Sequence, residues 1–426
     1  MRGYRLPLAL SIALISGLSF SNTPVANLFQ LANSNSPDMQ INRNEELISQ
    51  ENLRSAFGRL LPSVSANAGL SASGEDLSID FSESGLNAGI NLNQVIYDQR
   101  AISGYRAVEA NSQISQLQTK AAEQQLMLEV AEAAIAVLRA QTGLQLAERE
   151  QRAIERQLEQ TREKFAVGLV ARTDVEQAQA IFDSNQVRVI QAQSQLNSSQ
   201  RSLTTLVGQE VEVAPLVSTQ LPDREQLTTT SLQLAMLQSP SMQISQQSVR
   251  SQDLQLEASR AQRLPSVGTS LSYSQSVVNR FNDLETINSG STSFSVNASV
   301  PLFTGFQTSA DITQNQLRAE NARLRQEQQQ KQLADQIALM VDQLATSQAN
   351  IRAQEQLLRS RQSALEATQT GQEVGTQTLV DVLQAQSNSF AAEQDLANAR
   401  FDYLILQLQL KQMAGLLSLD DLRQLN

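Results

Sequence analysis

The sequence predicts a mainly α-helical protein with a smaller β part, in which one structural plan is written twice. Three observations support this prediction. Motifs recur at a fixed spacing in the two halves, which is the mark of an internal repeat. Long stretches without proline are typical of long helices. Four separate runs alternate apolar with small or polar residues, which is the period of a β-strand.

Two motifs define the repeat. Leu61-Pro62-Ser63-Val64 recurs 203 residues later as Leu264-Pro265-Ser266-Val267. Phe165-Ala-Val-Gly168 is matched 207 residues later by Gln372-Glu-Val-Gly375. The second half therefore carries about four extra residues between these motifs. Because loops tolerate extra length best, we expect the insertion in a loop near Asn279–Ser291.

The four alternating runs are predicted to be β-strands of about ten residues. In the first half they begin at Val64 and Leu86, and in the second half at Val267 and Phe294. This length fits a tilted strand that crosses a membrane. The partner faces are small and polar, as in the wall of a water-filled barrel. The alternative is two ordinary hairpins on a soluble core.

Four strands cannot close a barrel, and a sheet edge is not tolerated in lipid. The protein must then assemble, with eight strands as a dimer or twelve as a trimer. Twelve strands leave room for water, which suits the small polar faces and favours a trimer. Tyr97 and Phe303 are expected to close equivalent strands and are candidates for an aromatic girdle at the membrane interface.

The remaining segments are predicted to be helical. The stretch from Asp98 to Glu163 contains no proline. The last helix keeps a spacing of three and four from Val382 to Met413, with many small residues at the repeated positions. Such a pattern predicts helices that pack lengthwise as coiled coils. Gly168 and Gly375 interrupt the helices and are predicted to form matching helix-to-helix turns.

Composition excludes several function classes. The chain has no Cys and no His, so disulfides, thiolate nucleophiles, imidazole bases and the commonest zinc ligands are absent, and we expect no cofactor, no metal and no enzyme activity. A formal net charge of −11 argues against nucleic acid as a partner. The acidic neighbours Glu45-Glu46 and Asp420-Asp421 leave a hydrolase as an alternative, although such pairs are usually solvated. A secreted coiled-coil structural protein, such as an adhesin stalk, is another alternative.

The N-terminus predicts export. Arg2 and Arg5 precede an apolar stretch, Leu6 to Leu18, that is shorter than a spanning helix and lies where a signal sequence lies. We expect a signal peptide over residues 1–26, cleaved after residue 21 or 26. The rest divides into a first repeat over 27–208, a linker segment over 209–228, a second repeat over 229–414 and a C-terminal segment over 415–426.

Three segments resemble the TolC family of outer-membrane efflux and secretion channels. Lys164–Val175 is similar to the first-half turn of that family, Val374–Leu383 to its second-half turn, and Leu396–Ile405 to its last helix. The resemblance implies a homotrimer, with a 12-stranded barrel in outer-membrane lipid above a long periplasmic α-helical barrel. Segments 209–228 and 415–426 would form an equatorial belt around it.

The resemblance also implies a function and partners. It indicates a passive exit duct for drugs and small molecules, which receives its cargo from an inner-membrane pump of the RND or ABC type. A periplasmic adaptor, or membrane fusion protein, would join the two. The alternative within the family is an exit duct for type I protein secretion.

The resemblance further assigns roles at the two turns. Thr173 and Asp174 match positions that help to hold the duct closed in the family. Their usual partners on the second turn are a Tyr and an Arg, but Gln372 and Gln377 occupy those positions here. Arg172, next to this pair, is a candidate substitute cation.

Asp381 and Gln384 match two ring positions that line the constriction of the family's channels. Both are acidic in the family, so one of the two rings is neutral here. The remaining carboxylate ring predicts a cation-selective entrance. The alternative for Asp381 is a capping role at the start of a helix, where a carboxylate is favoured.

Overall fold

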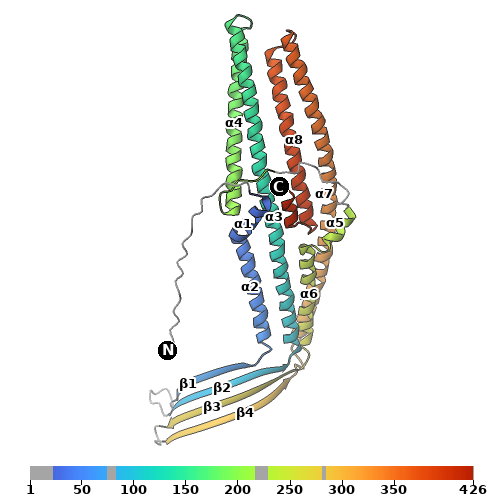
Figure 1. The fold of residues 1–426 in the computed structure, drawn as a ribbon. Coiled ribbons are helices and arrows are strands. Elements are labelled where there is room, and N and C mark those ends of the chain that lie inside the picture. The colour runs from blue at the N-terminus through green and yellow to red at the C-terminus, as the bar shows by residue number, and fades with distance from the viewer. Residues whose placement is uncertain (1–22, 74–82, 216–228, 281–284, 426) are drawn as a thin grey trace.

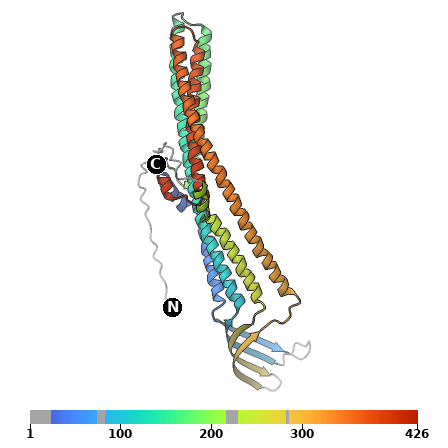
Figure 2. The ribbon, with the colours of Figure 1, turned by 90° about the vertical axis from the view of Figure 1, so that its right-hand side faces the viewer.

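The structure, a computed structural model, describes residues 23–73, 83–215, 229–280 and 285–425. The predicted signal peptide over residues 1–26 lies outside these residues except for its last four. Over the described part the molecule is elongated, with a curved sheet at one end and long helices running away from it (Figure 1). The side view shows that the helical part narrows into a thin stalk away from the sheet (Figure 2).

The sheet has four antiparallel strands in the order of the chain, which confirms the four predicted strands. They are β1 (Ser63–Ser73), β2 (Glu83–Tyr97), β3 (Ser266–Arg280) and β4 (Glu285–Ser299). Each repeat supplies one hairpin, and the two hairpins join where β2 pairs with β3. Within the described residues, β1 and β4 each pair on one side only.

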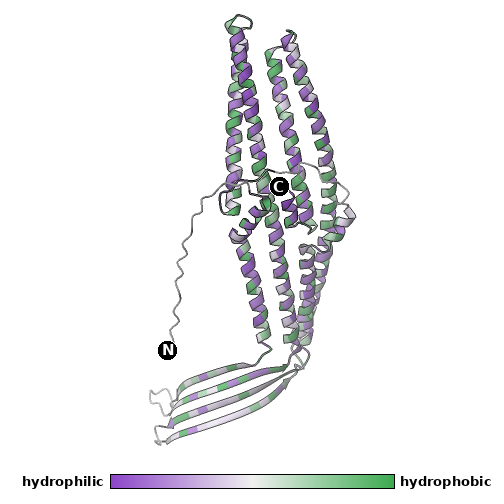
Figure 3. Ribbon diagram, viewed as in Figure 1, coloured by the Kyte–Doolittle hydropathy of each residue, from purple (hydrophilic) through white to green (hydrophobic). Residues whose placement is uncertain are grey.

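The two faces of the sheet differ in chemistry because successive side chains point to opposite sides. On one face, serines of β3 and β4 hydrogen-bond across the ladder at 2.6–2.8 Å. Asn91 likewise donates to Asn67 at 3.0 Å on this face. The other face carries exposed apolar side chains, including Val64, Ile90 and Phe294. Apolar and polar colours alternate along β1 and β2 in Figure 3, whereas β4 is mostly pale.

Two very long helices follow the hairpins, as predicted. α3 (Gln99–Ala166) has 68 residues and α7 (Gln307–Glu373) has 67. Each ends in a short turn at the far end of the molecule and returns as α4 (Arg172–Val207) or α8 (Leu379–Met413) (Figure 1). Among the described residues, no helix combines the length and the apolar character needed to cross a membrane.

Two shorter helices precede the strands. These are α2 (Pro37–Gly58) and α6 (Pro240–Ala261). Ser36 and Ser239 cap them. Ser36 Oγ accepts a hydrogen bond of 3.3 Å from Met39 N–H, and Ser239 Oγ accepts one of 3.4 Å from Met242 N–H. A proline at the first helical position costs no hydrogen bond, so the Ser-Pro pair starts both helices in the same way.

The largest apolar core lies half-way along the molecule. α1 (Val25–Asn35) and α9 (Leu419–Arg423) pack there beside the long helices. α5 (Thr229–Met236) lies beside α7 (Figure 1) and belongs to a second, smaller cluster. The fully buried side chains of the largest core come from segments far apart in the chain, among them Leu28, Ile135, Leu203 and Leu422. Thr23 also pairs with Val213 in a parallel bridge at this level. Burial of this apolar surface ties both ends of the described chain to the long helices.

The insertion in the second repeat lies after β4, so the expectation of a longer loop near Asn279–Ser291 is wrong. Most of that range belongs to β3 and β4, apart from residues 281–284, which lie outside the described residues. The two hairpins span 63–97 and 266–299 and are nearly equal in length. β2 passes to α3 through Asp98 alone, whereas β4 reaches α7 through Val300–Phe306.

The physical reason is that paired strands keep the two hairpins at matching lengths, so extra residues collect at the unpaired junction. Phe303 falls in this connector. It therefore does not close a strand as Tyr97 does, and that expectation is also wrong.

Candidate functional site at the helical tips

Gly168 and Gly375 end the two long helices in the same way. Both have left-handed backbone conformations, with φ of 77° and 82°. Leu169 N–H donates to Lys164 C=O at 2.9 Å, and Thr376 N–H donates to Gly371 C=O at 2.8 Å. This six-to-one bond after a left-handed residue is a Schellman motif, which satisfies carbonyls at the helix end and reverses the chain. Glycine adopts this conformation without the steric cost that a Cβ would add.

Asp174 and Asp381 occupy equivalent positions in the helices that return from these turns. Asp174 accepts a bond from Ala171 N–H at 3.2 Å. Asp381 accepts from Thr378 N–H at 2.9 Å and from the Thr378 hydroxyl at 2.7 Å. The second cap is reciprocal, because Asp381 N–H donates to Thr378 Oγ1 at 3.2 Å. The hydroxyl bond and then the backbone bond hold the pKa of Asp381 below its usual range.

The other predicted closure residues make contacts within their own hairpins. Arg172 Nε lies 3.4 Å from Glu176 Oε1 and so pairs along its own helix, not with Asp174. Gln377 packs back over Gly371 of its own turn. Gln384 donates to Asn388 Oδ1 at 3.2 Å on the exposed side of α8. Within the described protomer, no hydrogen bond joins Thr173 or Asp174 to the second turn, which holds Gln372 and Gln377.

An apolar cluster joins the two helical hairpins, α3–α4 and α7–α8, just behind the tips. It contains Ile154 and Leu158 of α3, Ala178 of α4, and Leu379 and Leu383 of α8. The first turn of α8 is therefore packed against the first hairpin. Any movement of the second turn away from the first must break this cluster.

A buried polar junction lies next to this cluster and was not predicted from the sequence. Glu150 of α3 is only 6% exposed, and its Oε1 lies 3.5 Å from Arg188 Nη1 of α4. The same Nη1 lies 3.4 Å from Ser387 Oγ of α8, so one guanidinium contacts two other helices. Asn185, one turn before Arg188, is 2% exposed, and neither of its amide atoms has a partner among the described residues.

The sequence did carry a signal for this junction. Leu146, Glu150, Ile154 and Leu158 recur every fourth residue and are all buried, so a carboxylate interrupts an apolar stripe. A charged residue on the buried face of a helix needs a partner. The pattern alone does not identify that partner as Arg188.

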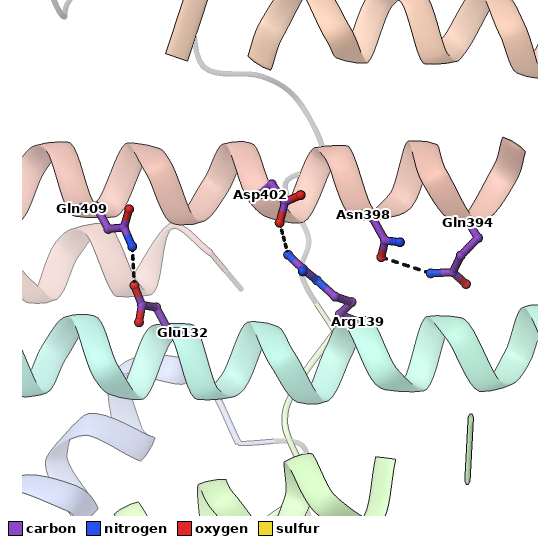
Figure 4. Close-up of polar contacts among 6 residues, drawn as sticks. All are labelled: Glu132, Arg139, Gln394, Asn398, Asp402 and Gln409. Atoms are coloured by element: carbon purple, nitrogen blue, oxygen red, sulfur yellow. Dashed lines mark hydrogen bonds and ion pairs between the residues drawn. The ribbon is translucent and has the colours of Figure 1, made fainter. Parts of the chain in front are cut away.

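Polar contacts continue along the antiparallel boundary between α3 and α8, which joins the two repeats (Figure 4). Gln409 donates to Glu132 at 2.8 Å, and Arg139 pairs with Asp402. Arg149 and Glu393 form a further pair at 2.6 Å. The Gln394 and Asn398 side chains also bond to each other along α8 in the same view.

Of the two acidic pairs that left a hydrolase as an alternative, Asp420-Asp421 has a structural role. Asp421 accepts bonds from Lys411 and from Ser418, the cap of α9. Burial opposes ionisation, but these bonds hold the pKa of Asp421 below its usual range. Across the described ranges, no group of three acidic side chains is placed to hold a metal ion. The tips and the boundary are thus built from caps, ion pairs and apolar contacts.

Known proteins resemble the chain over its whole length. The family described as outer membrane efflux protein matches residues 28–209 and 231–416, one match for each repeat. Outer membrane protein TolC of Vibrio cholerae is 32% identical over 432 residues, which cover 99% of this chain and 97% of that protein. Alkaline protease secretion protein AprF of Pseudomonas aeruginosa is 27% identical over 78% of this chain and 70% of its own length.

A solved structure shares the fold. The crystal structures of CusC, described in terms of folding and transmembrane channel formation, superpose with a TM-score of 0.81 at 19% identity. The match covers 97% of this chain and 99% of CusC. The architecture of sheet, stalk and two hairpins is therefore the one seen in these channel structures.

Proposed function

The chain belongs to the outer membrane efflux protein family, and from this premise we propose that three copies form one continuous export duct. It is an outer-membrane exit duct, and its family is one of channels and not of enzymes. In this assembly the mature chain comprises two repeats, 27–208 and 229–414, and two equatorial segments, 209–228 and 415–426.

The four-stranded sheet is the single observation that best supports assembly. Its outer strands β1 and β4 run antiparallel to each other, so β4 of one copy can pair with β1 of the next without a change of pattern. Three copies in a ring would give twelve strands and leave a water-filled interior. The apolar face would contact lipid, and the serine and asparagine face would line the lumen.

The helical part would extend the lumen into the periplasm. Within a protomer α3 and α8 pack against each other, while α4 and α7 flank them. The outer sides of α4 and α7 would meet neighbouring copies and close a helical barrel. In this assembly the tips form the far entrance, with Asp381 and Gln384 as the constriction rings. Thr173, Asp174 and Arg172 would then face Gln372 and Gln377 across the closed entrance.

The cargo is proposed from the relatives. The family is one of outer membrane efflux proteins, which favours export of drugs and small molecules. An inner-membrane pump of the RND or ABC type would supply the energy, and a periplasmic adaptor would connect pump and duct. The similarity to AprF, a protease secretion protein, supports type I protein secretion as the second candidate.

Assembly and conduction can be tested together. Protein extracted in detergent should migrate as a heat-sensitive trimer and should conduct ions after insertion into a planar lipid bilayer. A soluble periplasmic monomer without conductance would contradict the proposal.

A strain of the source cell that lacks this gene distinguishes the two cargo classes. Loss of efflux should lower the minimal inhibitory concentrations of several drugs, whereas loss of secretion should remove specific proteins from the medium. Re-expression of the wild-type chain should restore the missing activity. Adaptor and pump should co-purify with the chain after crosslinking in intact cells.

A further inference from the structure

An apolar segment stands out from the surface where the sheet meets the second long helix. This connector, Val300–Phe306, exposes Leu302 to 95%, Phe303 to 78% and Phe306 to 77%. These side chains are large, and burying them would be favourable. The connector is also the place where the second repeat is longer than the first.

The connector is held in one shape by local bonds. Thr304 Oγ1 accepts from Thr308 N–H at 3.3 Å, and Ser309 Oγ donates to Phe306 C=O at 2.7 Å. Gly305 and Phe306 are both left-handed, with φ of 58° and 66°. A bulky residue rarely adopts this conformation, and such strain persists where the surrounding structure requires it.

The strained backbone places two aromatic rings together. The Phe303 and Phe306 rings meet edge to face, with centroids 5.8 Å apart and planes at 83°. This is a favoured geometry for an aromatic pair. The segment is therefore a preformed apolar projection, which we term the aromatic knuckle (Leu302, Phe303 and Phe306).

The topology fixes what lies beside the knuckle in an assembled ring. Strand β4 ends at the helical end of the sheet, and β1 begins at that same end (Figure 1). When β4 of one copy pairs with β1 of the next, the connector after β4 lies beside the neighbour's junction between α2 and β1. That junction exposes Phe57 to 47% and Leu61 to 48%.

The same junction inside one protomer lacks such a projection. There β2 pairs with β3, and the connector after β2 is Asp98 alone; Leu264, the repeat equivalent of Leu61, lies just before β3. This internal junction lies within one chain, where the paired hairpins are already covalently linked. The junction between copies has no covalent link, and only there does the chain supply an aromatic connector.

We propose that the aromatic knuckle of one copy packs on the Phe57 and Leu61 side chains of the neighbouring copy and so clasps the trimer at the junction of sheet and helices. The proposal rests on the proposed trimer. The knuckle's partner is a second copy of this chain, because pairing of the sheet edges places the two apolar patches side by side.

Cysteine crosslinking tests the clasp, since the chain has no Cys of its own. Phe303→Cys combined with Leu61→Cys in one chain should give covalent dimers and trimers on a non-reducing gel after mild oxidation, because a disulfide requires Cα atoms within about 7 Å. The matched control is Phe303→Cys with Leu264→Cys. Leu264 is 44% exposed, close to the 48% of Leu61. This control should give no covalent oligomer.

A second cysteine pair distinguishes failure of the knuckle contact from failure of the trimer. Ser65→Cys with Asn297→Cys, together with pairs one register step to either side, reports pairing of β1 with β4 of the next copy. If an edge pair links the copies and the Phe303–Leu61 pair does not, the clasp is wrong while the trimer stands. If no pair links them and the bilayer shows no conductance, the trimer itself has failed.

Two further measurements can overturn the clasp. A fluorophore on Phe303→Cys that is quenched strongly by brominated phospholipid would place the knuckle in the membrane interface instead. Phe306→Asn keeps a residue that tolerates the left-handed backbone but removes the ring. Together with Phe303→Ala it should lower the temperature at which the trimer dissociates, and an unchanged dissociation temperature would contradict the clasp.

Discussion

Arg139 of α3 pairs with Asp402 of α8 across the boundary between the two repeats, and its guanidinium also lies 5.8 Å from the centre of the Phe401 ring. This pair belongs to a series of polar contacts between an apolar core half-way along the molecule and an apolar cluster at the tips. Partly exposed ion pairs contribute only about 0–1 kcal/mol each to folding. The two hairpins are therefore held together mainly by the apolar contacts at either end of the boundary.

The junction around Arg188 should be the exception to this weak boundary. Arg188→Met leaves the Glu150 carboxylate buried without its cation, which we expect to destabilise the protein by about 1–3 kcal/mol. Arg149→Met is the matched control, because Arg149 and Glu393 are both partly exposed. Its cost should stay below about 1 kcal/mol. Thermal unfolding of the purified trimer, followed by circular dichroism, compares the two variants.

Adding Glu150→Gln to Arg188→Met should recover part of the loss, since it removes the uncompensated charge. Equal destabilisation by Arg188→Met and Arg149→Met, with no recovery, would mean that Glu150 does not depend on Arg188.

The elements of the fold could be predicted because their signals are local. Period two from Val64 onward, the proline-free stretch before Gly168, and the glycines at both turns each specify structure within a few residues. The matching repeats then predicted two hairpins and two long helices. The alternative that Asp381 caps a helix was also open to prediction, because N-terminal acids are favoured whatever the tertiary context.

The contacts between helices could not be predicted, because periodicity does not set the axial register of two helices. Glu150 and Ser387 contact Arg188 only at one axial register of α3, α4 and α8. The place of the insertion was missed for a related reason. Loop preference favoured a site near Asn279, whereas strand pairing moved the extra residues to the connector that ends at Phe306.

The signal peptide is predicted to be cleaved after residue 21. Thr23 N–H donates to Glu212 C=O at 2.9 Å, and Val25 and Ala26 are buried in the central core. Cleavage after residue 26 would remove these contacts, so the folded protein favours the earlier site. N-terminal sequencing of the mature protein should read Asn-Thr-Pro-Val. A sequence that starts at Asn27 would contradict this prediction.

Closure at the tips should respond to a cation on the second turn. Gln377→Arg offers a guanidinium to Asp174, and a charge-assisted bond is stronger than the neutral one that glutamine can make. We expect lower conductance in planar bilayers and lower antibiotic entry in cells. Asp174→Ala alone should change either readout little, because Asp174 bonds only to its own cap in the protomer.

The double variant Gln377→Arg with Asp174→Asn supplies the control for this pairing. It should lose the tightening, since the new guanidinium has no carboxylate to meet. A sharp rise in conductance for Asp174→Ala in the parent would instead show that Asp174 already holds the entrance closed, with Arg172 as the nearest candidate cation.

Ion selectivity should depend on Asp381 and not on its repeat equivalent. Three copies of Asp381 at the entrance would attract cations, so Asp381→Asn should reduce the cation preference and the block by multivalent cations. Asp174→Asn is the matched control, because it removes a helix cap at the equivalent position of the other hairpin. Reversal potentials in planar bilayers measure the preference. If the two variants behave alike, Asp381 serves only as a cap.

The pH dependence of this selectivity follows from the cap. The Thr378 hydroxyl and N–H favour the ionised carboxylate and lower the pKa of Asp381 from its ordinary 3.8, so its charge persists at neutral pH and is lost only as the pH falls through the lowered value. Repulsion among three carboxylates opposes this shift. Thr378→Val removes the hydroxyl donor and raises the pKa, so cation preference should disappear at a higher pH than in the parent. An unchanged pH profile in Thr378→Val would mean that another group sets the selectivity.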